Sequence, residues 1–219
     1  MSREKLNSND KIYFNIGYLS CINLQIKDHN FTLSSNRTIF WENKSALLLS
    51  DIHAGGKTAI QTDILISNFK KALQEFEFNK LIILGDLFDA AASIKERQIF
   101  SEFLRTLNTN IILVLGNHDK LSEEEYREFG IKTIKESLKM DMFYLTHKPT
   151  ESEKINIHGH IHPSYYKRSL LIMNKLPCFV VEDNSICLPA FGGATGKNSF
   201  IPLAQRKIYV IRNNLVKLL

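Results

Sequence analysis

Four short apolar segments of this chain end at a serine or glycine that is followed by aspartate, asparagine or histidine. In the plainest of them, Leu81–Leu84 runs without a polar break into Gly85 and Asp86. Such a run predicts a strand buried on both faces, as in a parallel sheet. Open α/β sheets bind ligands at the carboxyl ends of their strands, so polar side chains placed there four times predict a metal centre. The other three segments span residues 46–53, 111–119 and 155–162.

Helical patterns lie between these segments. Apolar residues recur at helical spacing over Ile60–Phe78 and over Ser93–Leu107, which predicts two amphipathic crossover helices and a β-α-β-α-β order from residue 46 to residue 115. A third, short helix is expected to begin at Ser122, an N-cap residue followed by three glutamates. Further strands are expected at residues 12–16, 22–26, 31–33, 38–41, 142–146, 155–157, 169–173, 178–181, 185–188 and 207–211, with a hairpin turn at residues 183–184.

The whole chain is expected to form one α/β domain, residues 1–219, made of two sheets with helices outside. No linker, low-complexity stretch or repeat divides it, and 44% hydrophobic residues is an ordinary value for a globular protein. Residues 1–45 would supply a solvated tail and the strands that precede the first polar motif. Both halves are expected to contribute to one site.

Composition also constrains where the protein is located and what it could bind. No apolar run approaches the roughly 20 residues that span a bilayer, so we expect a soluble, unsecreted protein without a membrane partner. Three cysteines at unpaired spacing argue against a disulfide framework, and we expect a cytoplasmic location. The formal charge of +5 is only mildly basic, so charge alone leaves a nucleic-acid partner open.

Seven side chains in or near the strand-end motifs offer carboxylate oxygen, imidazole nitrogen and amide oxygen, with no thiolate. This set suits manganese, iron, zinc or magnesium rather than copper or an iron-sulfur cluster. Residues two apart on an extended chain point the same way, so an Asp-x-His or His-x-His pair is expected to hold one ion. Seven donors suit two ions about 3.5–4 Å apart that share a carboxylate, with Asp86 as the bridge. The candidates are Asp51, His53, Asp86, Asn117, His147, His160 and His162.

Two other histidines receive structural interpretations. His158 lies two residues before His160, but the intervening Gly159 breaks the strand, so we expect His158 to be a packed or capping residue. His29 lies in a turn cluster between two expected strands, and we expect it at the surface.

Taken in order, the motifs resemble the complete set of the calcineurin-like metallophosphoesterases. This resemblance implies a four-layered αββα sandwich and a two-metal phosphoesterase. It also implies one ion held by Asp51, His53, Asp86 and His162, and a second held by Asp86, Asn117, His147 and His160. The motifs are Asp51-x-His53, Gly85-Asp86-x-x-Asp89, Gly116-Asn117-His118-Asp119, His147 and Gly159-His160-x-His162.

A narrower resemblance, to the bacterial DNA-ligase-associated metallophosphoesterases of the DNA damage response endonuclease family, covers nearly the whole chain. It implies a DNA endonuclease or phosphodiesterase in DNA repair, working beside a ligase and a helicase, and manganese is the metal we expect first. Lys148 departs from the pattern of that family, which usually has glutamate there. The segments that carry the resemblance are Asp51–Lys57, His147–Pro149, His160–Pro163, Pro177–Phe179 and Leu188–Gly196.

The resemblance also suggests a catalytic role, and the charges near the motifs suggest how a substrate would bind. His118 is not a ligand in the family pattern and is expected to protonate the leaving oxygen, with Asp119 or Asp89 as the residue that orients it. Lysines near the motifs are expected to bind a polyanion, and the glycine-rich segment 191–197 is either a phosphate-binding loop or a structural turn. A phosphoesterase for nucleotides or other small esters is the second hypothesis. A non-catalytic scaffold is disfavoured because all ligands are present. The substrate-binding candidates are Lys57, Lys148 and Lys197.

Overall fold

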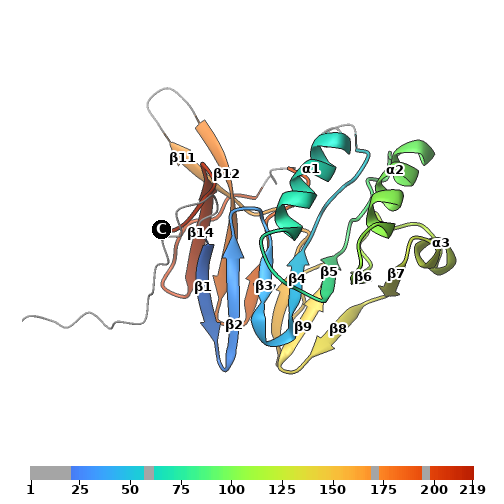
Figure 1. The fold of residues 1–219 in the computed structure, drawn as a ribbon. Coiled ribbons are helices and arrows are strands. Elements are labelled where there is room, and N and C mark those ends of the chain that lie inside the picture. The colour runs from blue at the N-terminus through green and yellow to red at the C-terminus, as the bar shows by residue number, and fades with distance from the viewer. Residues whose placement is uncertain (1–20, 57–61, 169–172, 194–197) are drawn as a thin grey trace, which may run out of the picture.

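The structure, a computed structural model, describes residues 21–56, 62–168, 173–193 and 198–219. Two mixed sheets pack face to face, and helices lie against the outer face of the first sheet (Figure 1). This confirms the expected α/β fold of two mixed sheets, but the described residues show helices on the first sheet alone and not the fourth layer of the αββα sandwich. The expected strand 12–16 lies outside the described residues, as does all of the expected strand 169–173 except Met173, which begins a longer strand.

The first sheet has the strand order β1-β2-β3-β4-β5-β6-β7. Strands β1 to β4 pair antiparallel, whereas β4 to β7 are parallel because helices connect them. Strand β7 was not predicted. The strands are β1 (Cys21–Ile26), β2 (His29–Ser34), β3 (Ile39–Trp41), β4 (Ala46–Leu49), β5 (Lys80–Leu84), β6 (Asn110–Val114) and β7 (Ile131–Ile134), with a 3-10 turn η1 (Glu42–Lys44) before β4.

Three helices connect the parallel strands, as expected: α1 (Thr62–Leu73), α2 (Ile94–Arg105) and α3 (Glu123–Glu128). Both α2 and α3 begin at a capping box in which a serine and the glutamate three residues later exchange hydrogen bonds. Helix α1 ends at Leu73, before the expected Phe78. Ile64 and Ile94 belong to the apolar pattern but lie exposed in the first turn of their helices.

The second sheet has the order β15-β14-β12-β13-β10-β9-β8, and β11 pairs with β12. Strands β9, β10 and β13 are parallel, and the other pairs are antiparallel. The expected hairpin turn joins β12 to β13. The strands are β8 (Ser137–Met140), β9 (Phe143–Thr146), β10 (Ile155–His158), β11 (Ser164–Arg168), β12 (Met173–Glu182), β13 (Ser185–Cys187), β14 (Arg206–Arg212) and β15 (Leu215–Leu218).

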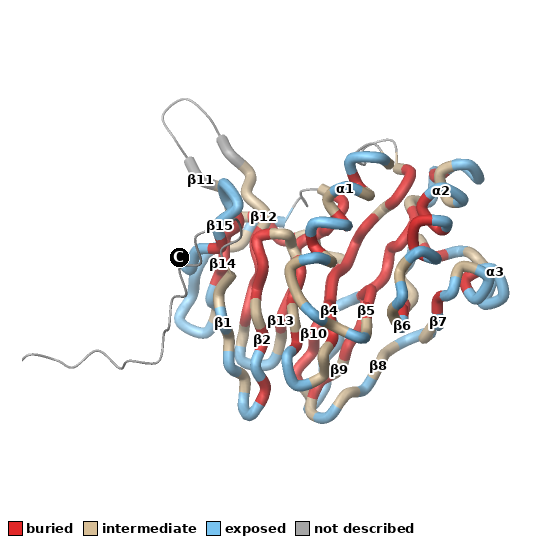
Figure 2. Tube along the Cα trace, in the orientation of Figure 1, coloured by how far each residue is buried: buried red, intermediate tan, exposed pale blue. Residues whose placement is uncertain are grey.

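The central strands β4 and β5 are buried on both faces, as predicted from their apolar runs (Figure 2). Leu48 and Ile82 pack in the core between the two sheets, whereas their neighbours Leu47 and Ile83 pack under the helices. A smaller cluster, which includes Cys178 and Val210, covers the outer face of the second sheet. Among the described residues no helix covers that face.

The prediction that His29 lies at the surface was wrong. His29 is the first residue of β2, it is 9% exposed, and its Nδ1 accepts a hydrogen bond of 3.0 Å from Trp41 Nε1–H. Its ring lies edge-on to that of Phe143, with 5.0 Å between centroids, and its Nε2 is 3.6 Å from Asp141. The turn pattern at Asp28 missed this because the aromatic partners of His29 come from other strands.

The described helices are all too short to cross a membrane. All three cysteines are free thiols, with Cys178 and Cys187 buried, as expected for a chain without a disulfide framework.

Candidate metal centre

The seven predicted ligands come together beyond the carboxyl ends of five strands. Asp51 follows β4, Asp86 follows β5, and Asn117 follows β6, while the second sheet contributes His147 after β9 and both His160 and His162 after β10. They form two adjoining groups. Potential ligand atoms of Asp51, His53 and His162 lie within 4.8 Å of one another, and so do those of Asp86, His147 and His160.

The backbone that brings these residues together is left-handed, not extended as predicted. Five non-glycine residues of the site have φ values between 49° and 68°, a region that such residues rarely adopt and that is enriched at functional sites. Of the two pairs separated by one residue, Asp51 and His53 lie in the same group, whereas His160 and His162 lie in different groups. The five residues are Asp51, His53, Asp86, His160 and His162.

The first group is centred on the fully buried Asp51. Its Oδ1 lies 3.1 Å from His162 Nε2, and its Oδ2 accepts a hydrogen bond of 2.9 Å from the backbone N–H of His160. His53 Nε2 is 3.4 Å from His162 Nε2. Burial lowers the pKa of His53, although the negative charge of Asp86 opposes the shift. His53 therefore favours the neutral form that can donate a lone pair to a metal.

In the second group, the tautomer of His147 is fixed by its surroundings. Nδ1–H donates to the carbonyl oxygen of Leu84 at 2.9 Å, so Nε2 directs a lone pair into the site. That nitrogen lies 3.3 Å from Asp86 Oδ2, 3.1 Å from Asn117 Oδ1 and 3.1 Å from His160 Nδ1. Electron-pair donors gathered this closely suit a positive charge among them, either a proton on Nε2 or a metal ion.

The electrostatics of His147 agree with a cation site. Burial by itself would lower the pKa of His147, but the contact with Asp86 and the charges of Asp51 and Asp86 prevail, so its pKa is raised. The negative field that would hold a proton on this imidazole also attracts a divalent metal ion.

Asp86 joins the two groups through a single oxygen. Oδ2 lies 3.3 Å from His147 Nε2 and 3.7 Å from His53 Nε2, while Oδ1 accepts the backbone N–H of His118 at 2.9 Å. Burial would raise the pKa of Asp86, but the contact with His147 and its charge, the N–H of His118 and the charge of His53 together lower it to about 2, so the carboxylate is ionised at neutral pH. Two sets of oxygen and nitrogen donors that share one carboxylate oxygen fit a pair of divalent cations.

The glycines of the motifs are needed because ligands approach them closely. A Cβ on Gly116 would lie 2.2 Å from Asp86 Oδ1, and one on Gly85, at φ 79°, would lie 2.3 Å from His147 Nδ1. Any side chain at these positions would displace a candidate ligand.

His118 lies beside the first group. Its ring centroid is 5.2 Å from that of His53, and atoms of His53, Asp89 and His118 lie within 4.8 Å of one another. Its Nδ1 is buried and has no hydrogen-bond partner within the described ranges. Of the two carboxylates proposed to orient His118, Asp89 is therefore the nearby one.

Asp119 has a different environment from the one expected of an orienting residue. Its carboxylate accepts the backbone N–H groups of Asp86, Leu87 and Gly116 at 2.8–3.0 Å, and the hydroxyl of Tyr126 at 3.2 Å. Burial raises the pKa of Asp119 although these N–H groups oppose the shift. Asp119 thus ties the end of β5 to the loop after β6.

Replacing Asp119 with alanine is expected to lower the free energy of unfolding by about 3 kcal/mol or more, because three buried N–H groups lose their acceptor at about 1–3 kcal/mol each. Tyr126→Phe removes one hydrogen bond and should cost only about 1 kcal/mol. Urea denaturation of both variants measures the difference. Equal, small losses would contradict this structural role for Asp119.

The predicted substrate-binding lysines are only partly described. Lys57 and Lys197 lie outside the described residues. Lys148 is exposed and lines a pocket with Asn117, His147 and Glu136. His158 is buried in β10, where its Nδ1–H donates to the Gly159 carbonyl, which agrees with the packing interpretation.

The described part of the glycine-rich segment is a structural turn. The N–H groups of Phe191 and Gly192 donate to the carbonyls of Ser50 and Asp51, and Arg37 donates to the carbonyls of Ala190 and Phe191. These bonds support the backbone of Asp51 from the second half of the chain. No sequence pattern indicated a role for Arg37. Residues 194–197 lie outside the described residues.

Comparison with known proteins agrees with this geometry. The family model described as calcineurin-like phosphoesterase matches residues 45–185. The crystal structure of a nuclease named MPE from Pseudomonas putida matches with a TM-score of 0.81 and 27% identity, covering 91% of this chain and 100% of that one. A protein of unknown function from Aquifex aeolicus matches with a TM-score of 0.40 and 20% identity, covering 53% of this chain and 78% of that one.

No curated protein matches the sequence. The family match, however, spans more than half of the chain and includes all seven predicted ligands. This chain belongs to the calcineurin-like phosphoesterase family of metal-dependent hydrolases.

Proposed function

We propose that this protein is a phosphodiesterase that cleaves DNA, with two divalent cations held on either side of Asp86. The position of Asp86 Oδ2 between two groups of donors carries the proposal. DNA as substrate is supported by the likeness to a nuclease over nearly the whole chain. Manganese as the metal, a role in cytoplasmic DNA repair, and a ligase and a helicase as partners are parts of the proposal that rest on the family resemblance.

The proposed mechanism assigns separate tasks to the residues of the site. When bound, the two cations would neutralise the phosphate oxygens and activate a water for attack on phosphorus. Asp51, fixed by the His160 N–H, and Asp86, fixed by the His118 N–H, keep the donors in place. His118 would protonate the leaving oxygen, with Asp89 near enough to position its ring.

The alternative is hydrolysis of nucleotides or other small phosphate esters. The observation that favours it is the pair of carboxylates that line the pockets beside the site, Asp89 on one side and Glu136 on the other. These would repel the flanking phosphates of a nucleic acid, which a small ester lacks.

A metal-by-substrate profile tests the proposed function. The metal-free protein would be loaded with manganese, iron, zinc or magnesium, then assayed on single-stranded DNA, duplex DNA, cyclic nucleotides and a nitrophenyl phosphodiester. We expect DNA cleavage whose KM rises steeply with salt, because contacts to several phosphates release counterions. Hydrolysis of small esters alone, with a shallow salt dependence, would favour the alternative.

Reversing the charge at Lys148 is expected to weaken DNA binding more than binding of a small ester. In Lys148→Glu, KM for single-stranded DNA should rise about 3- to 10-fold at low salt, the range of an exposed charge interaction that is both removed and reversed. Steady-state kinetics on both substrates measure this. Lys217→Glu, an equal change at an exposed position of β15, is the control, and equal effects of Lys148→Glu on both substrates would show that Lys148 contacts no polyanion.

A further inference from the structure

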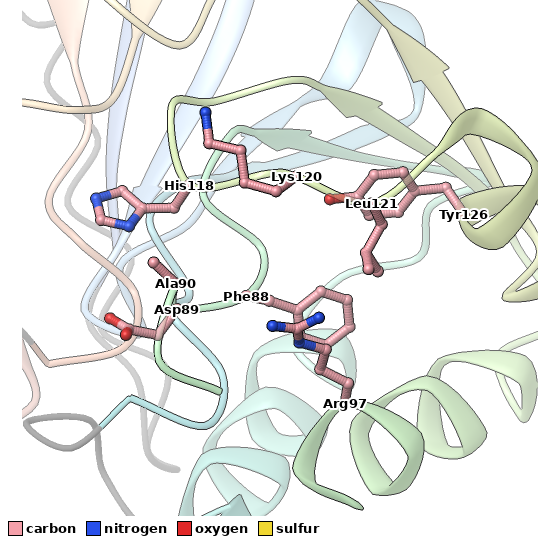
Figure 3. Close-up of a pocket in the computed structure, with 8 residues that line it drawn as sticks. All are labelled: Phe88, Asp89, Ala90, Arg97, His118, Lys120, Leu121 and Tyr126. Atoms are coloured by element: carbon pink, nitrogen blue, oxygen red, sulfur yellow. The ribbon is translucent and has the colours of Figure 1, made fainter. Parts of the chain in front are cut away.

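A pocket outside the metal-ligand groups opens beside His118. It is lined by His118 and Asp89 on the side of the metal centre, by Arg97 and Lys120, and by the apolar side chains of Phe88 and Leu121 (Figure 3). Its cavity volume of about 30 Å³ is far below the range of about 300–1,000 Å³ in which drug-sized ligands bind. The size suits one compact group rather than a stacked nucleobase.

Arg97 contributes N–H donors and a positive charge to the pocket. Its side chain extends from α2 toward the pocket (Figure 3), and its Nε is buried without a hydrogen-bond partner in the part of the chain that the structure describes. Buried donors without a partner are rare in proteins. Because Nε is closed off from solvent, an anion in the pocket would meet the outer nitrogens of the guanidinium. A guanidinium is a planar fork of N–H donors that matches the oxygens of a phosphate.

The charges of the pocket favour an anion as well. Arg97 and Lys120 contribute two positive charges. The one carboxylate, Asp89, accepts the Ala91 N–H and lies 3.7 Å from His53 Nδ1, so its charge is engaged on the side of the metal centre. Arg97, Lys120 and Asp89 together therefore give the lining one net positive charge.

The position of the pocket connects it to the proposed reaction. If His118 protonates the leaving oxygen, the leaving nucleoside emerges on the side of His118, which is the side of this pocket. We propose that Arg97 and Lys120 bind the next phosphate of the DNA strand on the leaving side, an inference that rests on the proposed DNA cleavage. The pocket would then distinguish a polynucleotide from an isolated phosphodiester.

Thymidine dinucleotides test this inference directly. The wild-type protein would be assayed on a dinucleotide without terminal phosphate and on two others that carry a phosphate at the 5′ or the 3′ end. We expect one of the phosphorylated forms to be preferred about 10- to 100-fold in kcat/KM, the range of a hydrogen bond to a charged group. Arg97→Gln should abolish this preference, whereas Arg212→Gln, the same change at an exposed position of β14, should retain it.

Binding provides a second readout, independent of turnover. The slope of log K against log salt for a single-stranded oligonucleotide should become shallower by about 0.7 in Arg97→Gln, the value for one lost phosphate contact. Lys120→Gln, at an exposed position, should reduce the preference and the slope even if Arg97→Gln fails to fold. Absence of any preference in the wild type, or a preference that both variants retain, would overturn the inference while leaving DNA cleavage intact. Failure of the wild type to cleave or bind any DNA would overturn the proposed function itself.

Discussion

Replacing Asp86 with asparagine should abolish phosphodiester hydrolysis and lower the metal content at both positions. The carboxylate oxygen that faces both donor groups, 3.3 Å from His147 Nε2 and 3.7 Å from His53 Nε2, would become part of a neutral amide. A neutral amide bridges two cations weakly, so both ions lose a ligand and the negative charge that holds them. Elemental analysis after metal loading and dialysis, together with DNA cleavage assays, measures both effects.

The control for this experiment is Asp183→Asn, the same change in an exposed hairpin turn. It should leave activity and metal content unchanged. Full metal occupancy with near-normal turnover in Asp86→Asn would show that Asp86 does not bridge two ions.

His118→Asn should keep both metal ions yet cleave DNA about 10²- to 10⁴-fold more slowly, which is the range of general acid catalysis. The alkoxide that leaves a DNA phosphodiester is strongly basic and needs a proton in the transition state. A nitrophenolate is stable enough to leave unassisted, so a nitrophenyl phosphodiester should lose distinctly less activity. The ratio of the two losses in kcat measures the assistance given to the leaving group.

The two substrates serve as controls for each other in this experiment, because damage to the metal centre would slow both equally. His118 is close enough to His53 and Asp89 to be a ligand itself. An equal loss on both substrates, with a fall in metal content, would assign His118 to metal binding, and another group would then have to supply the proton.

The parts of the fold that could be predicted are those in which a local pattern matched its environment. The run Leu81–Leu84 predicted a doubly buried strand because its neighbours cover both faces. Strand β7 was missed because Lys132 and Thr133 interrupt its apolar residues, and its pairing with β6 is decided by the arrangement of the sheet. The surface prediction for His29 failed for a related reason, since the residues that bury it are distant in sequence.

The gathering of the candidate ligands at one site could be predicted because their chemistry is local to each motif and all motifs lie at strand ends. The left-handed conformation of Asp51 and His53 could not be predicted, because glycine is the residue type that indicates a positive φ in a sequence. The hydrogen bonds of Asp119 could not be predicted from the sequence either. Its three backbone donors belong to residues that meet only when β5 and β6 pair.

The most direct test of the two-ion centre is the anomalous diffraction of crystals loaded with manganese. We expect two peaks per chain, about 3.5–4 Å apart, with Asp86 between them. One peak should lie against Asp51, His53 and His162, and the other against Asn117, His147 and His160. A single peak, or two peaks with Asp86 bound to neither, would contradict a dinuclear centre bridged by Asp86.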